Sequence, residues 1–119
     1  MRLNLDCIRD LLLTIEETYD FQNIMRYSKS DNNFKRLKKY SHEEIIYHVN
    51  QCDLSGLLIG LSMPDSGDFF VLSDLSPKGH QFVANIRSDT IWKKVKSKAI
   101  DVGCASLPSI FEIFANIFK

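Results

Sequence analysis

The sequence predicts an α+β domain that is mostly helical. Apolar residues recur at helical spacing in five separate stretches, and two short apolar runs flank a turn-rich segment near the middle of the chain. The chain has 119 residues, of which 45% are hydrophobic and 25% are charged. This is the composition of one soluble globular domain, and it excludes a disordered segment, a collagen and a coiled-coil rod.

Charge and hydropathy argue against a strongly basic nucleic-acid-binding protein, a membrane protein and a secreted protein. Fifteen Lys and Arg residues balance fifteen Asp and Glu residues, whereas a protein that mainly neutralises phosphates usually carries an excess of cations. No apolar run approaches the roughly 20 residues that a membrane span needs. Residues 1–6 contain an acidic residue where a signal peptide would have its apolar stretch. We therefore expect a cytoplasmic protein with no membrane partner.

Motifs for catalysis and metal binding are missing from the local sequence. The three cysteines, Cys7, Cys52 and Cys104, form no CxxC pair, and His48 with Cys52 supplies only two potential ligands. There is no G-x-S-x-G motif, no P-loop and no dinucleotide fingerprint. We expect buried structural thiols, no metal, no cofactor and no enzymatic activity.

The first third of the chain combines one clear helix with an irregular stretch. Residues 4–19 carry an apolar stripe at spacings of three and four, and Asn4 is suited to cap this helix. Residues 20–40 are the least regular, with a polar loop at 28–33. Residues 34–40, which hold four cations between apolar residues, fit either a short strand or a single turn.

A capping box begins the next helix. Ser41 is followed three residues later by Glu44, which predicts a helix from this point to about Asp53. Gly56 is placed to end it in the left-handed conformation. The residues expected on the buried side of this helix are Ile45, Val49 and Cys52.

A hairpin and a third helix follow. The apolar runs 57–62 and 69–74 enclose a turn-rich segment, which is typical of two paired strands. Ser76-Pro77 is a cap followed by proline at the first helical position, and the helix should run to about Arg87. The residues expected to be buried on it are Phe82, Val83 and Ile86.

Two more helices are expected at the end of the chain. The first starts at Ser88 or Asp89 and ends at Gly103, with Trp92 as a core anchor. Its inward residues should be Trp92, Val95, Ala99 and Ile100. The second covers residues 106–119 and has a wide apolar stripe.

The order of these elements is that of a winged helix-turn-helix domain. A helix that ends in a Gly-Leu-Leu step precedes a two-stranded hairpin, the wing. The phrase Leu75-Ser76-Pro77-Lys78-Gly79-His80-Gln81-Phe82 is similar to the L-T-x-x-G-x-x-F phrase that follows the wing in many bacterial winged-helix proteins. We expect a single domain in which residues 1–87 form the winged-helix core and 88–119 a C-terminal helical extension.

Five segments in order resemble one uncharacterised family of bacterial and prophage proteins, domain of unknown function family 2513. These segments are residues 5–13, 40–49, 75–82, 86–96 and the helix that begins at Ser106. The resemblance implies a winged-helix fold and a phage or mobile-element setting, and it implies no activity.

DNA binding is the first functional hypothesis. In a winged helix, the helix before the hairpin enters the major groove, and Asn and Gln can pair with adenine. The residues that this helix would present are Ser41, His42, Tyr47, Asn50 and Gln51. Two basic groups would contact phosphates if the fold brings them onto one face. They are Lys35, Arg36, Lys38 and Lys39, and Lys93, Lys94, Lys96 and Lys98.

Protein binding is the competing hypothesis. Glu43 and Glu44 at the start of the proposed recognition helix would repel DNA, and the wing tip carries Asp65 and Asp68 without a cation. If the protein binds DNA as a regulator, we expect the basic groups and this helix to share one positive surface. An acidic surface on the helix and wing, together with an apolar patch, would instead favour a protein partner such as a host protein.

A homodimer is also expected. The last helix is too apolar for a free surface helix in a chain of this length, so some of its side chains should meet a second copy. The residues assigned to that interface are Ile110, Phe111, Phe114, Ile117 and Phe118.

Overall fold

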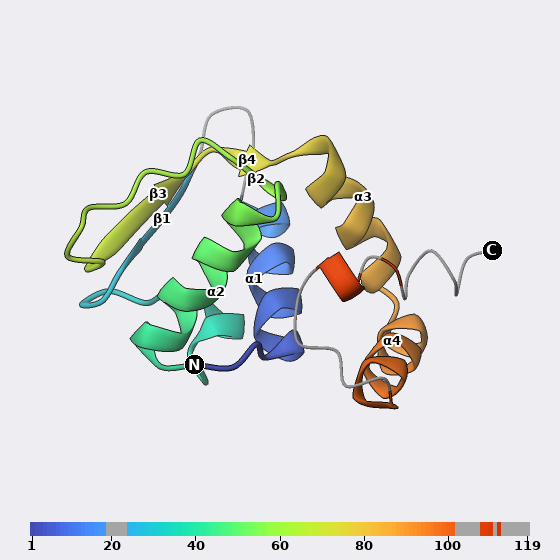
Figure 1. Cartoon of the computed structure of the whole chain (residues 1–119). Helices are drawn as coiled ribbons and strands as arrows, with labels where there is room; N and C mark the ends of the chain where they lie inside the picture. The colour runs from blue at the N-terminus through green and yellow to red at the C-terminus, as the bar shows by residue number, and fades with distance from the viewer. Residues whose placement is uncertain (19–23, 102–107, 111, 113–119) are drawn as a thin grey trace.

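The computed structural model describes residues 1–18, 24–101, 108–110 and 112, and it is α+β and mostly helical (Figure 1). The helices are α1 (Leu5–Thr18), the single 3₁₀ turn η1 (Lys35–Leu37), α2 (His42–Leu54), α3 (Pro77–Ile86) and α4 (Asp89–Asp101). The strands are β1 (Met25–Ser28), β2 (Leu58–Ile59), β3 (Phe69–Leu72) and β4 (Asp74–Leu75).

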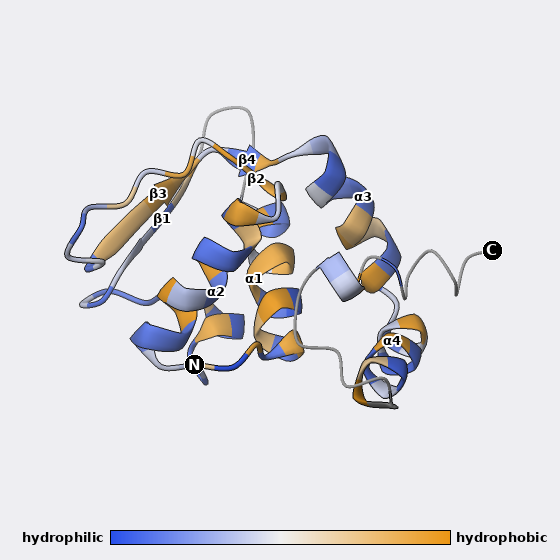
Figure 2. Cartoon of the chain, viewed as in Figure 1, coloured by the Kyte–Doolittle hydropathy of each residue, from blue (hydrophilic) through white to orange (hydrophobic). Residues whose placement is uncertain are grey.

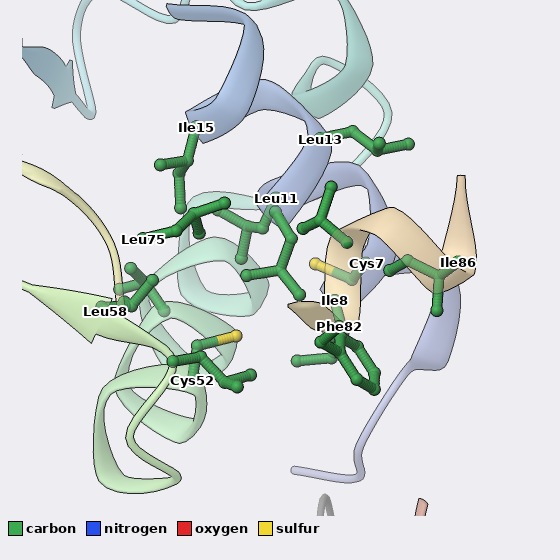
Figure 3. Close-up of a cluster of buried hydrophobic side chains, with 14 of the residues drawn as sticks. Cys7, Ile8, Leu11, Leu13, Ile15, Cys52, Leu58, Leu75, Phe82 and Ile86 are labelled. Atoms are coloured by element: carbon green, nitrogen blue, oxygen red, sulfur yellow. The ribbon is translucent and has the colours of Figure 1, made fainter. Parts of the chain in front are cut away.

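Helix α1 lies at the centre of the hydrophobic core. Residues 11–15 are all buried, and the helix contacts α2, η1, α3 and β4. Side chains from α2, α3 and β4 converge on it in Figure 3, where Leu11 and Ile15 meet Leu75 and Phe82 comes from α3. The Asn4 side chain accepts hydrogen bonds from the backbone N–H groups of Asp6 and Cys7, which confirms the predicted cap.

The predicted hairpin is present, and a further strand lies beside it. β2 pairs with β4, and in the same register Ser62, which follows β2, forms an isolated bridge with Val71 of β3. β1 pairs with β3 over four residues, from Met25 opposite Leu72 to Ser28 opposite Phe69. The segment 69–75 therefore lies between β1 and the segment 58–62, and β1 with β3 lies at the end of the molecule opposite α4 (Figure 1).

The irregular stretch contains more structure than the sequence indicated. β1 was not predicted, although Met25 and Tyr27 are buried and alternate with more exposed residues. The polar loop at 28–33 is confirmed as a turn, and residues 35–37 form the single turn that was one of the two alternatives for 34–40.

The predicted caps at both ends of α2 are present, as is the cap of α3, where the Ser76 hydroxyl accepts from the Gly79 N–H at 3.0 Å. The Ser41 hydroxyl accepts from the Glu44 N–H while the Glu44 carboxylate accepts from the Ser41 N–H, so the capping box is complete. Helix α2 ends at Leu54, and Gly56 follows with φ of 78°. This is the left-handed conformation that glycine adopts most easily.

Gly79 lets α3 lie directly on the chain that links α2 to the hairpin. A Cβ atom at Gly79 would stand 2.2 Å from the Leu57 carbonyl oxygen. Ser76 stabilises the same contact between α3 and the linking chain. Its hydroxyl donates to the Gly56 carbonyl at 2.6 Å, and its N–H donates to the Leu57 carbonyl at 2.9 Å. This explains why the phrase beginning at Leu75 has glycine at that position.

Helix α4 packs through Trp92, Val95 and Ala99, which are buried as predicted. Ile100 was expected to point inward, but 76% of it is exposed. Because each helical residue advances by about 100°, the residue after Ala99 lies off the buried line. In Figure 2, hydrophobic and hydrophilic residues alternate around α4. The predicted end at Gly103 and most of the helix at 106–119 lie outside the described residues.

His48 is fully buried and hydrogen-bonded on both ring nitrogens. Nδ1 lies 2.6 Å from the Glu44 carbonyl, which can only accept, so Nδ1 carries the proton. Nε2 accepts from the backbone N–H of Asn4 at 2.8 Å. Burial lowers the pKa of His48, although its hydrogen bond to Glu44 acts in the opposite direction. The neutral ring thus joins α2 to the start of α1.

Replacing Gly79 with alanine tests the close approach of α3. We expect Gly79→Ala to lower the free energy of unfolding by about 3 kcal/mol, because a backbone carbonyl cannot rotate away from the added methyl group. This loss exceeds the gain of roughly 1 kcal/mol in helix propensity.

Urea denaturation measures the change, with Gly56→Ala as the control. Gly56 has no atom within 4 Å of an added Cβ, so only its positive φ opposes alanine, at a cost of about 1–2 kcal/mol. A Gly79 variant as stable as the wild type would contradict the packing.

The buried neutral ring of His48 predicts a pH-dependent stability. Because the folded-state pKa lies below the unfolded value of 6.5, the unfolded chain takes up a proton first as the pH falls. The free energy of unfolding should therefore decrease below about pH 6.5, by up to about 1.4 kcal/mol per pH unit from this group.

Urea denaturation between pH 7.5 and pH 5 checks this, with His48→Gln as the comparison. Glutamine does not titrate, so its curve should be flatter in this range even if the variant is less stable overall. Parallel curves for the two proteins would contradict the assignment.

Candidate functional site

The candidate site is the surface formed by the outward side of α2 and the hairpin at 58–75, here called the α2–hairpin face. A hollow of about 390 Å³ lies between these two elements. Its apolar lining comes from Ile46, Leu61, Met63 and Pro64. Asn50 and Asp65 stand at its border, and both are exposed. The face thus offers a depression that combines aliphatic side chains with polar and acidic groups.

His42 holds the hairpin loop against α2. Its Nε2 lies 2.7 Å from the carbonyl oxygen of Gly67 and therefore donates to it. Its Nδ1 lies 2.8 Å from the hydroxyl of Tyr27, and the two rings are stacked with centroids 5.7 Å apart. Both ring nitrogens are used within the chain, so the structure gives His42 a positioning role for the loop.

The other residues proposed for this helix differ in their availability. The Ser41 side chain is occupied by the capping box. Tyr47 is half-buried, with its ring edge against His48 at 5.0 Å between centroids, and Gln51 is also half-buried. Asn50 alone among the five is both exposed and part of the hollow.

The α2–hairpin face is acidic. Between residues 40 and 77 the sequence has no Lys or Arg, so all fifteen cations lie in residues 1–39 and 78–119. The same stretch contains six carboxylates: Glu43, Glu44, Asp53, Asp65, Asp68 and Asp74. Within the described residues, Glu43, Asp53, Asp65 and Asp68 have no ion pair. Asp65 stands at the border of the hollow, whereas Glu44 lines a second hollow together with Arg2 and Lys96.

The first basic group is partly neutralised by α1. Arg36 binds both carboxylate oxygens of Glu17, the closest pair being 2.7 Å apart. Lys39 lies 3.1 Å from Asp10, whose carboxylate also accepts from the Tyr40 hydroxyl at 2.6 Å. Burial and this bond raise the pKa of Tyr40 above its ordinary value. Lys35 and Lys38 are exposed and have no ion pair within the described residues.

The second basic group is also partly neutralised by a carboxylate of α1. Lys96 lies 3.0 Å from Asp6, which also accepts from the Trp92 indole N–H at 3.0 Å. Burial opposes ionisation of Asp6, but the bonds from Trp92 and Lys96 outweigh it, so its pKa lies below the ordinary value. The exposed members without an ion pair to a described residue are Lys93, Lys94 and Lys98.

The two basic groups therefore both approach α1. Both Lys39 and Lys96 lie close enough to Asp6 to lower its pKa. Three of the predicted phosphate contacts, Arg36, Lys39 and Lys96, are instead ion-paired to carboxylates of α1. The charge of these three cations is therefore partly balanced at α1.

Arg9 is a positioning residue that the sequence analysis missed. Its guanidinium donates to the carbonyls of Ile86 and Arg87, both at 2.9 Å, and to the Asp89 carboxylate at 2.7 Å. It therefore joins the end of α3 and the start of α4 to α1. No local pattern indicates these contacts, because the partners lie more than 75 residues away along the chain.

The cysteines Cys7 and Cys52 are buried free thiols, as predicted, and Cys104 lies outside the described residues. Burial raises the pKa of Cys7 to about 12 and that of Cys52 further. Among the residues described, no group of three or more His, Cys, Asp or Glu side chains is placed to hold a metal ion. None of the described helices combines the length and apolar character that a membrane span requires.

The proposed dimer residues fall mostly outside the described part of the chain. Phe111, Phe114, Ile117 and Phe118 are not described. Ile110 is only 1% exposed and belongs to the hydrophobic core of its own chain. Its side chain is therefore not available to a second copy.

Comparison with known proteins identifies the family. The family model described as "Hypothetical protein (DUF2513)" matches residues 2–105. The chain belongs to the DUF2513 family. This match spans every element from α1 to α4, so the α2–hairpin face lies inside the DUF2513 region.

A curated relative of this DUF2513 chain is an "Uncharacterized protein" of Haemophilus influenzae. It is 27% identical over 124 residues, which cover 100% of this chain and 97% of the relative. No solved structure matches the chain.

Removing the His42 ring tests its role in the face. We expect His42→Ala to lower the free energy of unfolding by about 1–2 kcal/mol, because it breaks two partly buried hydrogen bonds. The backbone amides of the hairpin loop should also exchange with solvent faster.

Urea denaturation and hydrogen exchange check this, with His80→Ala as the control. His80 has an exposed pair with Asp74, so its loss should cost well under about 1 kcal/mol. Unchanged loop exchange in the His42 variant would contradict the positioning role.

Proposed function

We propose that this protein is a non-enzymatic binding module on a winged-helix scaffold, and that its α2–hairpin face binds a positively charged segment of another protein. The order α1, β1, η1, α2 and hairpin supports the scaffold, with η1 in place of the helix that usually precedes the recognition helix. The strand order, with residues 69–75 between β1 and 58–62, also fits this layout.

One observation carries the choice of a protein partner. The elements that a winged helix would insert into DNA, α2 and the hairpin, contain six carboxylates and no Lys or Arg. Half or more of the hydrogen bonds in protein–DNA complexes go to the phosphates and sugars, and binding depends on neutralising phosphate charge. An acidic face would repel the backbone on both sides of the groove.

The hollow on the same face, with its aliphatic side chains and polar border, supports this proposal. Protein interfaces combine an apolar centre with a polar rim, whereas DNA backbones offer no apolar side chain to fill a depression. Ile46, Leu61 and Met63 are half-buried and continue into the hydrophobic core, so the floor of the hollow is firmly held. In the phage or mobile-element setting that the family resemblance implies, the partner would be a host protein.

Nucleic-acid binding through α4 is the second candidate function. Lys93, Lys94 and Lys98 are exposed and have no ion pair within the described residues. They would contact phosphates without help from α2, giving binding that depends on salt and not on sequence. This function uses a different surface, so one set of variants separates the two.

A selection from a library of random dodecapeptides tests the proposal. We expect the peptides enriched on the wild-type protein to carry Lys or Arg around an apolar residue. Asn50→Arg should weaken their binding about tenfold or more, because it fills the border of the hollow and adds a like charge. The matched control is Gln81→Arg, an exposed amide on α3 outside the face, which should bind as the wild type does.

A DNA titration provides the opposing result. Fluorescence anisotropy with a random duplex of about 20 base pairs, at about 50 and 200 mM salt, should show no salt-dependent binding by the α2–hairpin face. If no peptide is enriched, while duplex binding appears and is lost when Lys93, Lys94 and Lys98 become glutamine, the proposal fails and the second candidate is correct.

A further inference from the structure

The first strand of the hairpin has an open edge beside the hollow. Ser62 and Val71 exchange both backbone hydrogen bonds, at 2.8 Å and 2.9 Å. In an antiparallel pair, only alternate residues bond to the partner strand. The N–H and C=O groups of Leu61 and Met63, on either side of Ser62, therefore point away from β3.

These backbone groups are unpaired within the described part of the chain. Neither Leu61 nor Met63 has a backbone hydrogen bond to another described residue. On the other side of the sheet, β1 covers β3 over four residues. The edge at Leu61–Met63 is therefore open to a further strand, and unpaired edges readily accept one.

The hollow and the edge adjoin each other. Leu61 and Met63 contribute to the hollow, and Ile46 of α2 lines it from the other side. A chain paired along the edge would lie in the space between the hairpin and α2. Since successive side chains of a strand point to opposite faces, one of its side chains would enter the hollow and the next would point outward.

The charge of the face selects among extended chains. Asp65 at the border of the hollow has no ion pair within the described residues, and no cation occurs between residues 40 and 77. An acidic peptide would meet like charge, whereas a peptide with Lys or Arg beside its apolar residue would gain ion pairs at the rim.

We infer that the α2–hairpin face binds its partner by strand addition: an extended cationic segment pairs with the backbone of Leu61 and Met63 and places one apolar side chain in the hollow beside Ile46. This inference rests on the proposed function and specifies the binding mode. Main-chain bonds would supply affinity, and the hollow with Asp65 would select the side chains.

Pro64 limits the length of the pairing. Pro64 begins a turn in which its carbonyl accepts from the Gly67 N–H at 2.9 Å, so the extended edge ends directly after Met63. A short edge closed by proline is also a common protection against uncontrolled sheet extension. The added strand therefore pairs over only a few residues, so its side chains must supply most of the selectivity for one peptide over another.

The experiment uses the tightest dodecapeptide from the selection described above, labelled with fluorescein, and the full chain. Each backbone amide of the peptide is N-methylated in turn, which removes one donor at a time and leaves the side chains and charges unchanged. We expect two positions, two residues apart, at which methylation weakens binding about tenfold. In parallel, hydrogen exchange of the Leu61 and Met63 amides should slow when the peptide is bound.

The outcomes separate the binding mode from the proposed function. A peptide that binds the wild type and loses affinity with Asn50→Arg, but tolerates N-methylation everywhere and does not protect these amides, overturns strand addition and leaves the protein-binding face in place. If the peptide carries no cations, or if Asn50→Arg binds it equally well, the proposed function fails and strand addition on this face fails with it.

Discussion

Helix α1 is the constraint on which the rest of the structure depends. It is buried on every side along residues 11–15, and its polar side chains are bound by elements from the whole length of the chain. Asp6 binds α4, Asp10 and Glu17 bind the segment around η1, and Arg9 joins α3 to α4. Truncation of a buried Leu or Ile in such a helix typically costs about 2–5 kcal/mol.

This arrangement decides where positive charge is available. Exposed ion pairs contribute little stability, typically up to about 1 kcal/mol, so the pairs with Arg36, Lys39 and Lys96 matter chiefly for charge. In these pairs the carboxylates of α1 neutralise cations that would otherwise add to the positive charge of the two basic groups. No ion pair among the described residues joins a Lys or Arg to a carboxylate of α2 or of the hairpin.

The elements predicted correctly from the sequence are those marked by a motif of a few neighbouring residues. The caps at Asn4, Ser41 and Ser76, the left-handed glycine after α2 and the hairpin are each encoded within a few residues. The acidic character of the face was also readable, since the gap in cations between residues 40 and 77 needs only a count.

Long-range contacts explain what local sequence did not predict. β1 has only four residues, and its partner β3 lies more than 40 residues later, so no local pattern marks it as a strand. From the sequence, His42 is expected among the residues that α2 would present to DNA. Its ring instead bonds to Tyr27 and Gly67, which come from two other parts of the chain.

Native-state hydrogen exchange by NMR tests the central position of α1 most directly. Helix amides that are buried at the centre of a core exchange only when the whole domain unfolds. The amides of Leu11 to Ile15 should therefore be among the slowest, with a free energy of opening equal to that of global unfolding by urea. If these amides exchange through a smaller opening while α2 and α3 remain protected, α1 does not hold the domain together.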